Sequence, residues 1–73
     1  MITVFTTNQC AYCVMVKKFL TMKGTEYKVV NIEDEPEIRK SLFKKTGSMT
    51  VPIIQKDEKY LVGWNPGKLA AFI

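Results

Sequence analysis

The sequence predicts a small α/β domain, in which three helices flank a four-stranded mixed sheet in the order β-α-β-α-β-β-α. Short runs rich in β-branched residues predict the strands, and apolar residues at helical spacing between them predict the helices. A hairpin pattern in the second half predicts the antiparallel part of the sheet. The chain has 73 residues, of which 47% are hydrophobic, so it can form one core of modest size. We therefore expect a single domain over residues 1–73.

The first half of the chain has the pattern of a strand-helix-strand unit. Residues 2–5 form a short apolar run that predicts a buried strand. A helix is expected from Ala11 until Gly24, because glycine commonly ends helices. The residues at helical spacing are Tyr12, Met15, Val16, Phe19 and Leu20. We expect these to be core residues except Tyr12, which lies beside the cysteines. Residues 27–32 follow as a second strand, and such a crossover is almost always right-handed.

A second helix is expected to start at residues 35–37. A proline in the first turn of a helix loses no hydrogen bond, and the acids here face the positive end of the helix dipole. We interpret the acidic run of residues 33–37 as structural rather than catalytic. Gly47 is expected to adopt the left-handed conformation that ends the helix. The apolar stripe of this helix consists of Ile38, Leu42 and Phe43.

The remaining residues predict a hairpin and a short helix. Two strands, residues 51–55 and 59–62, flank the polar loop 56–58. Residues 63–67 contain two glycines and a proline and predict a turn. Residues 68–72 are expected to form a final short helix.

The charge pattern argues against several classes of partner. The net charge is +4, but the lysines fall on the polar faces of the helices and the acids of residues 33–37 interrupt them. No segment has the features of a targeting signal or reaches the length of a membrane span. We therefore expect a soluble, cytoplasmic protein, most simply a monomer, that binds neither nucleic acid nor membrane.

The two cysteines of the chain, Cys10 and Cys13, are separated by two residues. A structural zinc site needs four ligands, and the chain has no histidine and no third cysteine, so only a dimer or a bound small thiol would complete such a site. A disulfide across so short a loop stabilises a fold little. A reversible dithiol is therefore the leading interpretation, with no metal site within one chain.

The position of the pair at the start of a helix suggests different tasks for its two sulfur atoms. Cys10 falls near the N-cap, where we expect its sulfur to accept hydrogen bonds from the backbone N–H groups of Tyr12 and Cys13. Such donors favour the thiolate, which is the nucleophile. Cys13 lies one turn further along and is expected to be more buried. We expect Cys10 to attack a disulfide and Cys13 to resolve the mixed disulfide.

The chain resembles the glutaredoxin family over essentially its whole length. The resemblance rests on the first strand, the sequence CAYC at residues 10–13, which compares with the family's C-P-Y-C, the sequence TVP at residues 50–52, and the glycine turn after the hairpin. It implies a thioredoxin fold, a redox-active Cys10–Cys13 disulfide with no bound cofactor, and a cis peptide bond before Pro52. The backbone of Val51 would pair with a bound thiol substrate. The substrate-binding residues implied are Tyr12, Thr50, Val51, Pro52, Gly63 and Trp64.

Two departures from the family bear on the reductant. Thr7 stands where glutathione-using members typically carry lysine, and VGWNPGK at residues 62–68 replaces their G-G-x-D-D-like turn. The latter is similar to the G-F-x-P turn of NrdH-redoxins, which thioredoxin reductase reduces and which pass electrons to ribonucleotide reductase. Ala11 replaces the family proline between the cysteines. The resemblance thus implies an electron donor for protein disulfides; the alternatives are a glutathione-dependent glutaredoxin and a dimer that holds an iron–sulfur cluster through Cys10.

Overall fold

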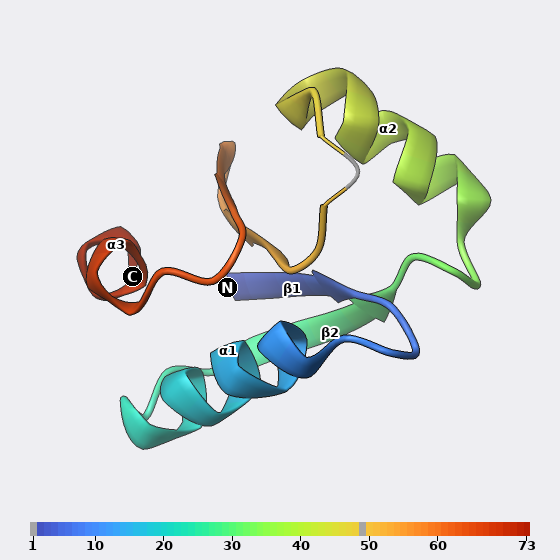
Figure 1. Ribbon diagram of the computed structural model, residues 1–73. Helices are drawn as coiled ribbons and strands as arrows, with labels where there is room; N and C mark the ends of the chain where they lie inside the picture. The colour runs from blue at the N-terminus through green and yellow to red at the C-terminus, as the bar shows by residue number, and fades with distance from the viewer. Residues whose placement is uncertain (1, 49) are drawn as a thin grey trace.

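The computed structural model describes residues 2–48 and 50–73 and has the predicted order of elements (Figure 1). Residues 1 and 49 belong to the predicted domain but lie outside the described part of the chain. The elements are β1 (Ile2–Thr6), α1 (Ala11–Met22), β2 (Tyr27–Asn31), α2 (Pro36–Thr46), β3 (Ile53–Lys56), β4 (Lys59–Val62) and α3 (Pro66–Phe72). None of these helices combines the length and the apolar character that crossing a bilayer requires.

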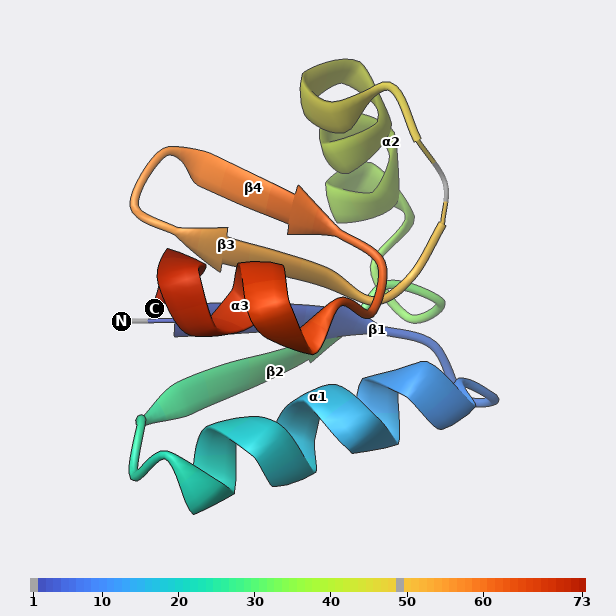
Figure 2. The same ribbon diagram turned by 60° about the vertical axis from the view of Figure 1, so that its left-hand side comes forward.

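The four strands form one mixed sheet in the order β2-β1-β3-β4. β1 runs parallel to β2 and antiparallel to β3, and β3 pairs with β4 as a hairpin. Phe5 near the end of β1 is paired with Ile53 at the start of β3, which in turn is paired with Val62 at the end of β4. The segments after β1, before β3 and after β4 therefore lie at the same edge of the sheet, as Figure 2 shows.

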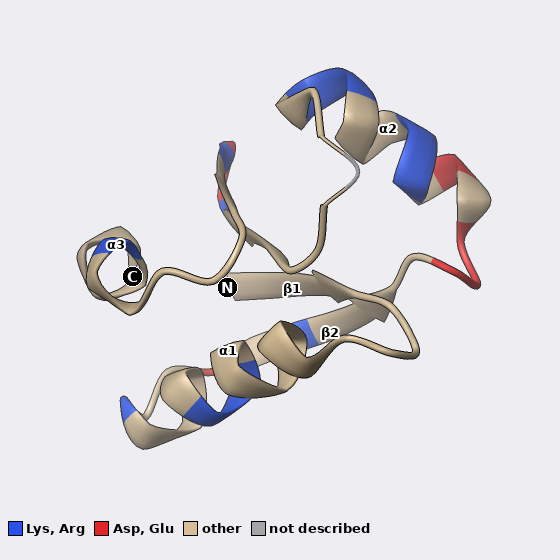
Figure 3. Cartoon of the chain, viewed as in Figure 1, with Lys and Arg blue, Asp and Glu red and all other residues tan. Residues whose placement is uncertain are grey.

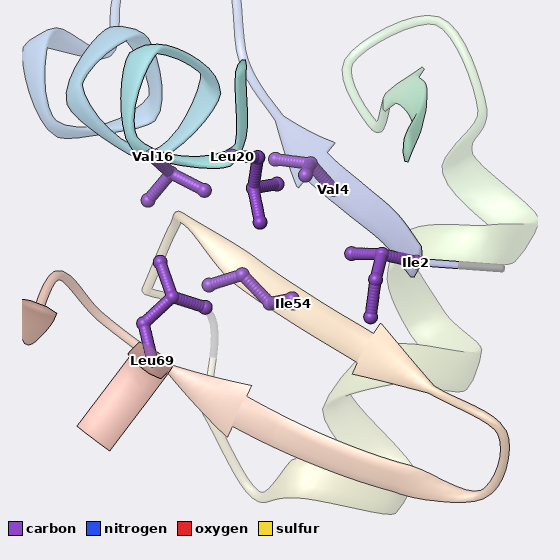
Figure 4. Packing of buried hydrophobic residues seen from close by; sticks show 6 residues of the cluster. All are labelled: Ile2, Val4, Val16, Leu20, Ile54 and Leu69. Carbon is purple, nitrogen blue, oxygen red and sulfur yellow. The ribbon is translucent and has the colours of Figure 1, made fainter. Parts of the chain in front are cut away.

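Two apolar clusters cover the two faces of the sheet. Alternate residues of a strand point to opposite faces, so Val4 and Phe5 belong to different clusters. The first cluster joins β1 and β3 to α1 and α3 through Ile2, Val4, Val16, Leu20, Ile54 and Leu69 (Figure 4). The second joins the other face to α2 through Phe5, Ile32, Leu42 and Ile53. Hence α1 and α3 pack on one face and α2 packs on the other.

Several element boundaries differ from the prediction. β3 begins at Ile53 rather than at residue 51, because Val51 and Pro52 precede the paired residues. β2 ends at Asn31, one residue early, and the hairpin turn is reduced to Asp57 and Glu58 because Lys56 remains in β3. Asp57 has a positive φ of 55°, which aspartate tolerates better than most residues.

The last helix begins at Pro66 rather than at residue 68. The reason is a local cap, in which the side-chain oxygen of Asn65 accepts a hydrogen bond from the N–H of Lys68 at 3.0 Å. Proline at the first helical position needs no donor there. Gly63 keeps the predicted turn, with a φ of 88°.

Met15 is substantially exposed, so its prediction as a core residue is wrong, and Phe43 of the predicted apolar stripe is exposed as well. The residues of α1 that are buried are Cys13, Val16 and Leu20, which form a narrow line along the helix. In α2 only Leu42 is buried, and Ile38 is half-buried beside it. Each residue along a helix is rotated by about 100° from its neighbour, so Met15 and Phe43 turn away from these lines. The helices contact the sheet over less of their circumference than the apolar pattern indicates.

Candidate active site

The cysteines form a disulfide at the start of α1, with their Cα atoms 5.2 Å apart. Cys10 is the N-cap, in the extended conformation, and its Sγ atom accepts a hydrogen bond from the N–H of Cys13 at 3.1 Å. A cap side chain bonds the second or third N–H of its helix, and here it bonds the third. The predicted N-cap position is therefore confirmed. In the described part of the chain, the predicted second donor, the N–H of Tyr12, does not bond this sulfur.

The two cysteines differ in their access to solvent. Cys10 is half-buried, whereas Cys13 is 1% exposed and belongs to the buried line of α1. Tyr12 between them is 61% exposed, so its ring lies on the surface beside the disulfide. A partner molecule can therefore approach Cys10 but cannot reach Cys13 directly.

A pair of amide side chains supports the loop that leads to Cys10. The Nδ2 group of Asn31, at the end of β2, donates a hydrogen bond to Oδ1 of Asn8 in this loop. The Oδ1 atom of Asn31 also accepts a hydrogen bond from the N–H of Glu33 at 2.9 Å. No local pattern in the sequence predicts this pair, because its two asparagines lie 23 positions apart.

The segment before β3 forms another part of the same edge. The Val51–Pro52 peptide bond is cis, as the resemblance implies. Pro52 is fully buried, and its carbonyl oxygen accepts a hydrogen bond from the N–H of Gly63 at 2.7 Å. Val51 is half-buried, and Thr50 is exposed. The structure thus brings Pro52 and Gly63 into direct contact.

Trp64 is half-buried and packs mainly inside the molecule. Its ring meets the ring of Phe19 in α1 edge to face, with centroids 5.9 Å apart and planes at 76°. Such a pair stabilises the packing beyond its buried area. Trp64 therefore links the turn after β4 to α1, and its expected contact with a substrate remains a prediction.

The three segments that hold Cys10, Pro52 and Gly63 carry no charged residue. No aspartate, glutamate, lysine or arginine occurs in residues 2–16, 46–55 or 60–67. Figure 3 shows the corresponding ribbon in tan at the start of α1 and through the turn between β4 and α3. Thr7 is half-buried in the first of these segments. These three segments thus present polar and apolar groups, whereas the acids Glu33 and Asp34 follow β2 at the same edge of the sheet.

Comparison with known proteins identifies relatives that match most of the chain. The model of the glutaredoxin family matches residues 2–61. A glutaredoxin from Pseudomonas aeruginosa is 36% identical over 62 residues, which cover 85% of this chain and 74% of the relative. The glutaredoxin-like protein NrdH from Lactococcus lactis subsp. cremoris is 34% identical over 70 residues, which cover 96% of each chain.

Solved structures share the architecture. NrdH-redoxin from Escherichia coli superposes with a TM-score of 0.87 at 22% identity, over 99% of this chain and 93% of that one. This likeness shows that the sheet and helices are those of the thioredoxin fold. Together with the CxxC pair at the start of α1, the family match means that this chain belongs to the glutaredoxin family of thiol-disulfide oxidoreductases.

Proposed function

We propose that the protein is a dithiol electron donor, which reduces disulfides in other proteins and is re-reduced by a thioredoxin reductase. The observation that carries this proposal is the asymmetry of the pair. Cys10 is accessible and accepts a backbone hydrogen bond at 3.1 Å, whereas Cys13 is buried behind it. After reduction, the same N–H donor favours the thiolate of Cys10.

The reaction follows from this arrangement in two exchanges. The Cys10 thiolate attacks one sulfur of the substrate disulfide, forming a mixed disulfide and releasing the other substrate sulfur as a thiolate, which takes up a proton. The Cys13 thiolate, formed by loss of its proton, then attacks the Cys10 sulfur. This step forms the Cys10–Cys13 disulfide and releases the second substrate thiol. Two electrons pass to the substrate, and a reductase must return two electrons to the protein.

Charge supports a thioredoxin reductase rather than glutathione as the source of these electrons. Glutathione presents two carboxylates and one ammonium group, and a selective site would offer opposite charges near the sulfur. The three segments that hold Cys10, Pro52 and Gly63 contain none, and the charges that follow β2 at the same edge are acidic, so they would repel the glutathione carboxylates. The 34% identity to an NrdH protein over nearly the whole chain supports the same choice. We include ribonucleotide reductase among the proposed disulfide substrates on this basis.

One observation favours glutathione as a second reductant. Lys17 and Lys18 lie on α1 after the disulfide, Lys17 half-buried and Lys18 exposed. Either ammonium group can attract a glutathione carboxylate, so we expect weak glutathione-dependent activity. A dimer that holds an iron–sulfur cluster through Cys10 is the other alternative, and a sample purified without oxygen tests it by its visible absorbance.

Reduction kinetics test the choice of reductant. With NADPH and a thioredoxin reductase, we expect kcat/KM at least about tenfold above that with glutathione and glutathione reductase, or about 1.4 kcal/mol of transition-state stabilisation. Thr7→Lys should raise the glutathione rate because it adds a cation near Cys10, and Thr7→Ser should not. Rapid turnover with glutathione and none with thioredoxin reductases would overturn the proposal.

A further inference from the structure

The outward face of α2 carries an exposed aromatic residue surrounded by cations. Phe43 is 49% exposed, although burying a large apolar side chain stabilises a protein. It lines an open groove of about 540 Å3 together with Pro36, Arg39, Lys40 and Lys44. We call this surface the α2 groove. An apolar floor with a charged rim is typical of a surface that binds another molecule.

The α2 groove is separate from the disulfide. α2 contacts the sheet through Leu42 and Ile38, on the face opposite to the one that α1 and α3 cover. The groove residues lie on the other side of the helix and face away from the sheet. Figure 1 shows α2 standing apart from the start of α1, where the cysteines lie. A molecule in the groove would therefore leave Cys10 accessible.

The charges of the groove select an anionic occupant. Its lining contributes three cations, Arg39, Lys40 and Lys44, and none of its lining residues is acidic. Arginine binds carboxylates through two parallel hydrogen bonds, and lysine adds a compact point charge with no preferred direction. The occupant must also carry an apolar group, because Phe43 and Pro36 form the floor. A single small anion would leave this floor exposed.

The acids before α2 limit the length of that occupant. Glu33, Asp34, Glu35 and Glu37 are exposed and lie at the N-terminal end of the helix. Figure 3 shows this acidic segment in red at the start of α2, in which blue and tan stretches alternate further along. A long polyanion such as a nucleic acid strand would extend from the groove onto these carboxylates, and like charges repel. A short segment avoids them.

We propose that the α2 groove is a docking site for a short acidic segment of another protein, with an apolar side chain among its carboxylates. The apolar side chain packs on Phe43 and Pro36, and the carboxylates pair with Arg39, Lys40 and Lys44. The surface does not require the dithiol chemistry, so it binds in both redox states of the cysteines. Its binding weakens with salt, because exposed ion pairs are screened.

A titration followed by NMR of the full 73-residue chain tests this site. The probe is a six-residue peptide, blocked at both ends, with four glutamates around one leucine and one phenylalanine. We expect amide shifts at residues 37–44 in both redox states. The shifts should weaken when the ionic strength rises from about 0.05 M to about 0.5 M, where the Debye length falls from roughly 14 Å to roughly 4 Å.

Three variants of the groove test which of its side chains bind the peptide. Replacing Arg39, Lys40 and Lys44 together by glutamate should raise the dissociation constant by roughly tenfold or more, as expected for three exposed pairs. Replacing the same three residues by glutamine removes their charge without reversing it, so it serves if the glutamate variant disturbs the helix. It should raise the dissociation constant by a smaller factor. Phe43→Ala should also weaken the peptide, and a peptide with alanine at both apolar positions should bind the unaltered protein less well.

The matched control changes the same amount of charge elsewhere. Lys28, Lys59 and Lys68 are exposed and lie outside the α2 groove. Their joint replacement by glutamate should leave the amide shifts at residues 37–44 nearly unchanged after correction for net charge. An equal loss in this variant and in the groove variant would overturn the proposal.

Other results would also overturn it. Shifts at the groove of α1, which Val14, Lys17 and Met22 help to line, would place the peptide elsewhere. Equal or tighter binding of a short single-stranded oligonucleotide of the same charge would make the surface a nucleic acid site. Shifts that follow protein concentration without peptide would make a second copy of this chain the occupant. The absence of any shift at millimolar peptide would leave the groove without the proposed function.

Discussion

At Cys10, two structural features act on the same sulfur atom. The residue is the N-cap of α1, so the sulfur accepts a hydrogen bond from the N–H of Cys13. Cys10 is also only half-buried, so a disulfide in another protein can reach its sulfur. Cys13 has the opposite environment, because it belongs to the buried line of the helix. A separation of three residues is therefore enough to give the two sulfur atoms the different environments that the proposed roles of nucleophile and resolving partner require.

This division of labour predicts different products for the two serine variants. Cys10→Ser should abolish reduction of protein disulfides, because the accessible nucleophile is lost. Cys13→Ser should accumulate a mixed disulfide with the substrate, which mass spectrometry under non-reducing conditions would detect. Labelling of the reduced protein with iodoacetamide at neutral pH provides the control, and faster labelling of Cys13 than of Cys10 would contradict the assignment.

Among the elements, α3 depends most on its local cap. It is a helix of 7 residues with one buried residue, Leu69, and isolated helices of this length are unstable in water. The side chain of Asn65 satisfies the N–H of Lys68, and Pro66 starts the helix. Because the turn before α3 also carries Gly63 and Trp64, the position of the helix fixes one side of the candidate active site.

Asn65→Ala should therefore lower the free energy of unfolding by about 1 kcal/mol, the usual cost of losing an N-cap. Asn65→Asp should retain most of the stability, because a carboxylate accepts the same hydrogen bond and suits the helix dipole. Urea unfolding of the oxidised proteins measures both changes. An equal loss in the two variants would show that the amide contributes through something other than the cap.

For the whole molecule, stability rests on two thin apolar layers around one sheet. Leu20 is fully buried in the first layer, where it packs with Val16, Ile54 and Leu69. α2 joins the second layer through buried Leu42, with Ile38 half-buried beside it. A domain of this size has little stability to lose, because the fraction of surface that folding buries falls as chains become shorter.

Leu20→Ala should destabilise the protein by about 2–5 kcal/mol, the range for a buried leucine whose removal leaves a cavity. Met22→Ala provides the control, because Met22 is 84% exposed at the end of the same helix and its change should stay within about 0.5 kcal/mol. The midpoint of urea unfolding measures both. Similar midpoints for the two variants would mean that α1 is not packed as described.

The sequence by itself determined the order of the elements, the start of α1 at Ala11 and the N-cap position of Cys10. These features depend on interactions between neighbouring residues, such as helix periodicity, capping and turn preferences, and are therefore visible in short stretches of sequence. The resemblance to the family added the cis bond before Pro52, which periodicity alone does not reveal. The roles of Thr50, Val51 and Trp64 toward a substrate remain predictions.

Only the tertiary structure decided which apolar residues are buried and which distant groups meet. Met15 and Phe43 follow the helical spacing, yet they are exposed because the contact of each helix with the sheet is narrower than its apolar stripe. The hydrogen bond between Asn8 and Asn31 depends on the pairing of β1 with β2 and so has no local signal. Burial and long-range hydrogen bonds depend on how elements pack against one another, and that packing is a property of the whole fold rather than of any one segment.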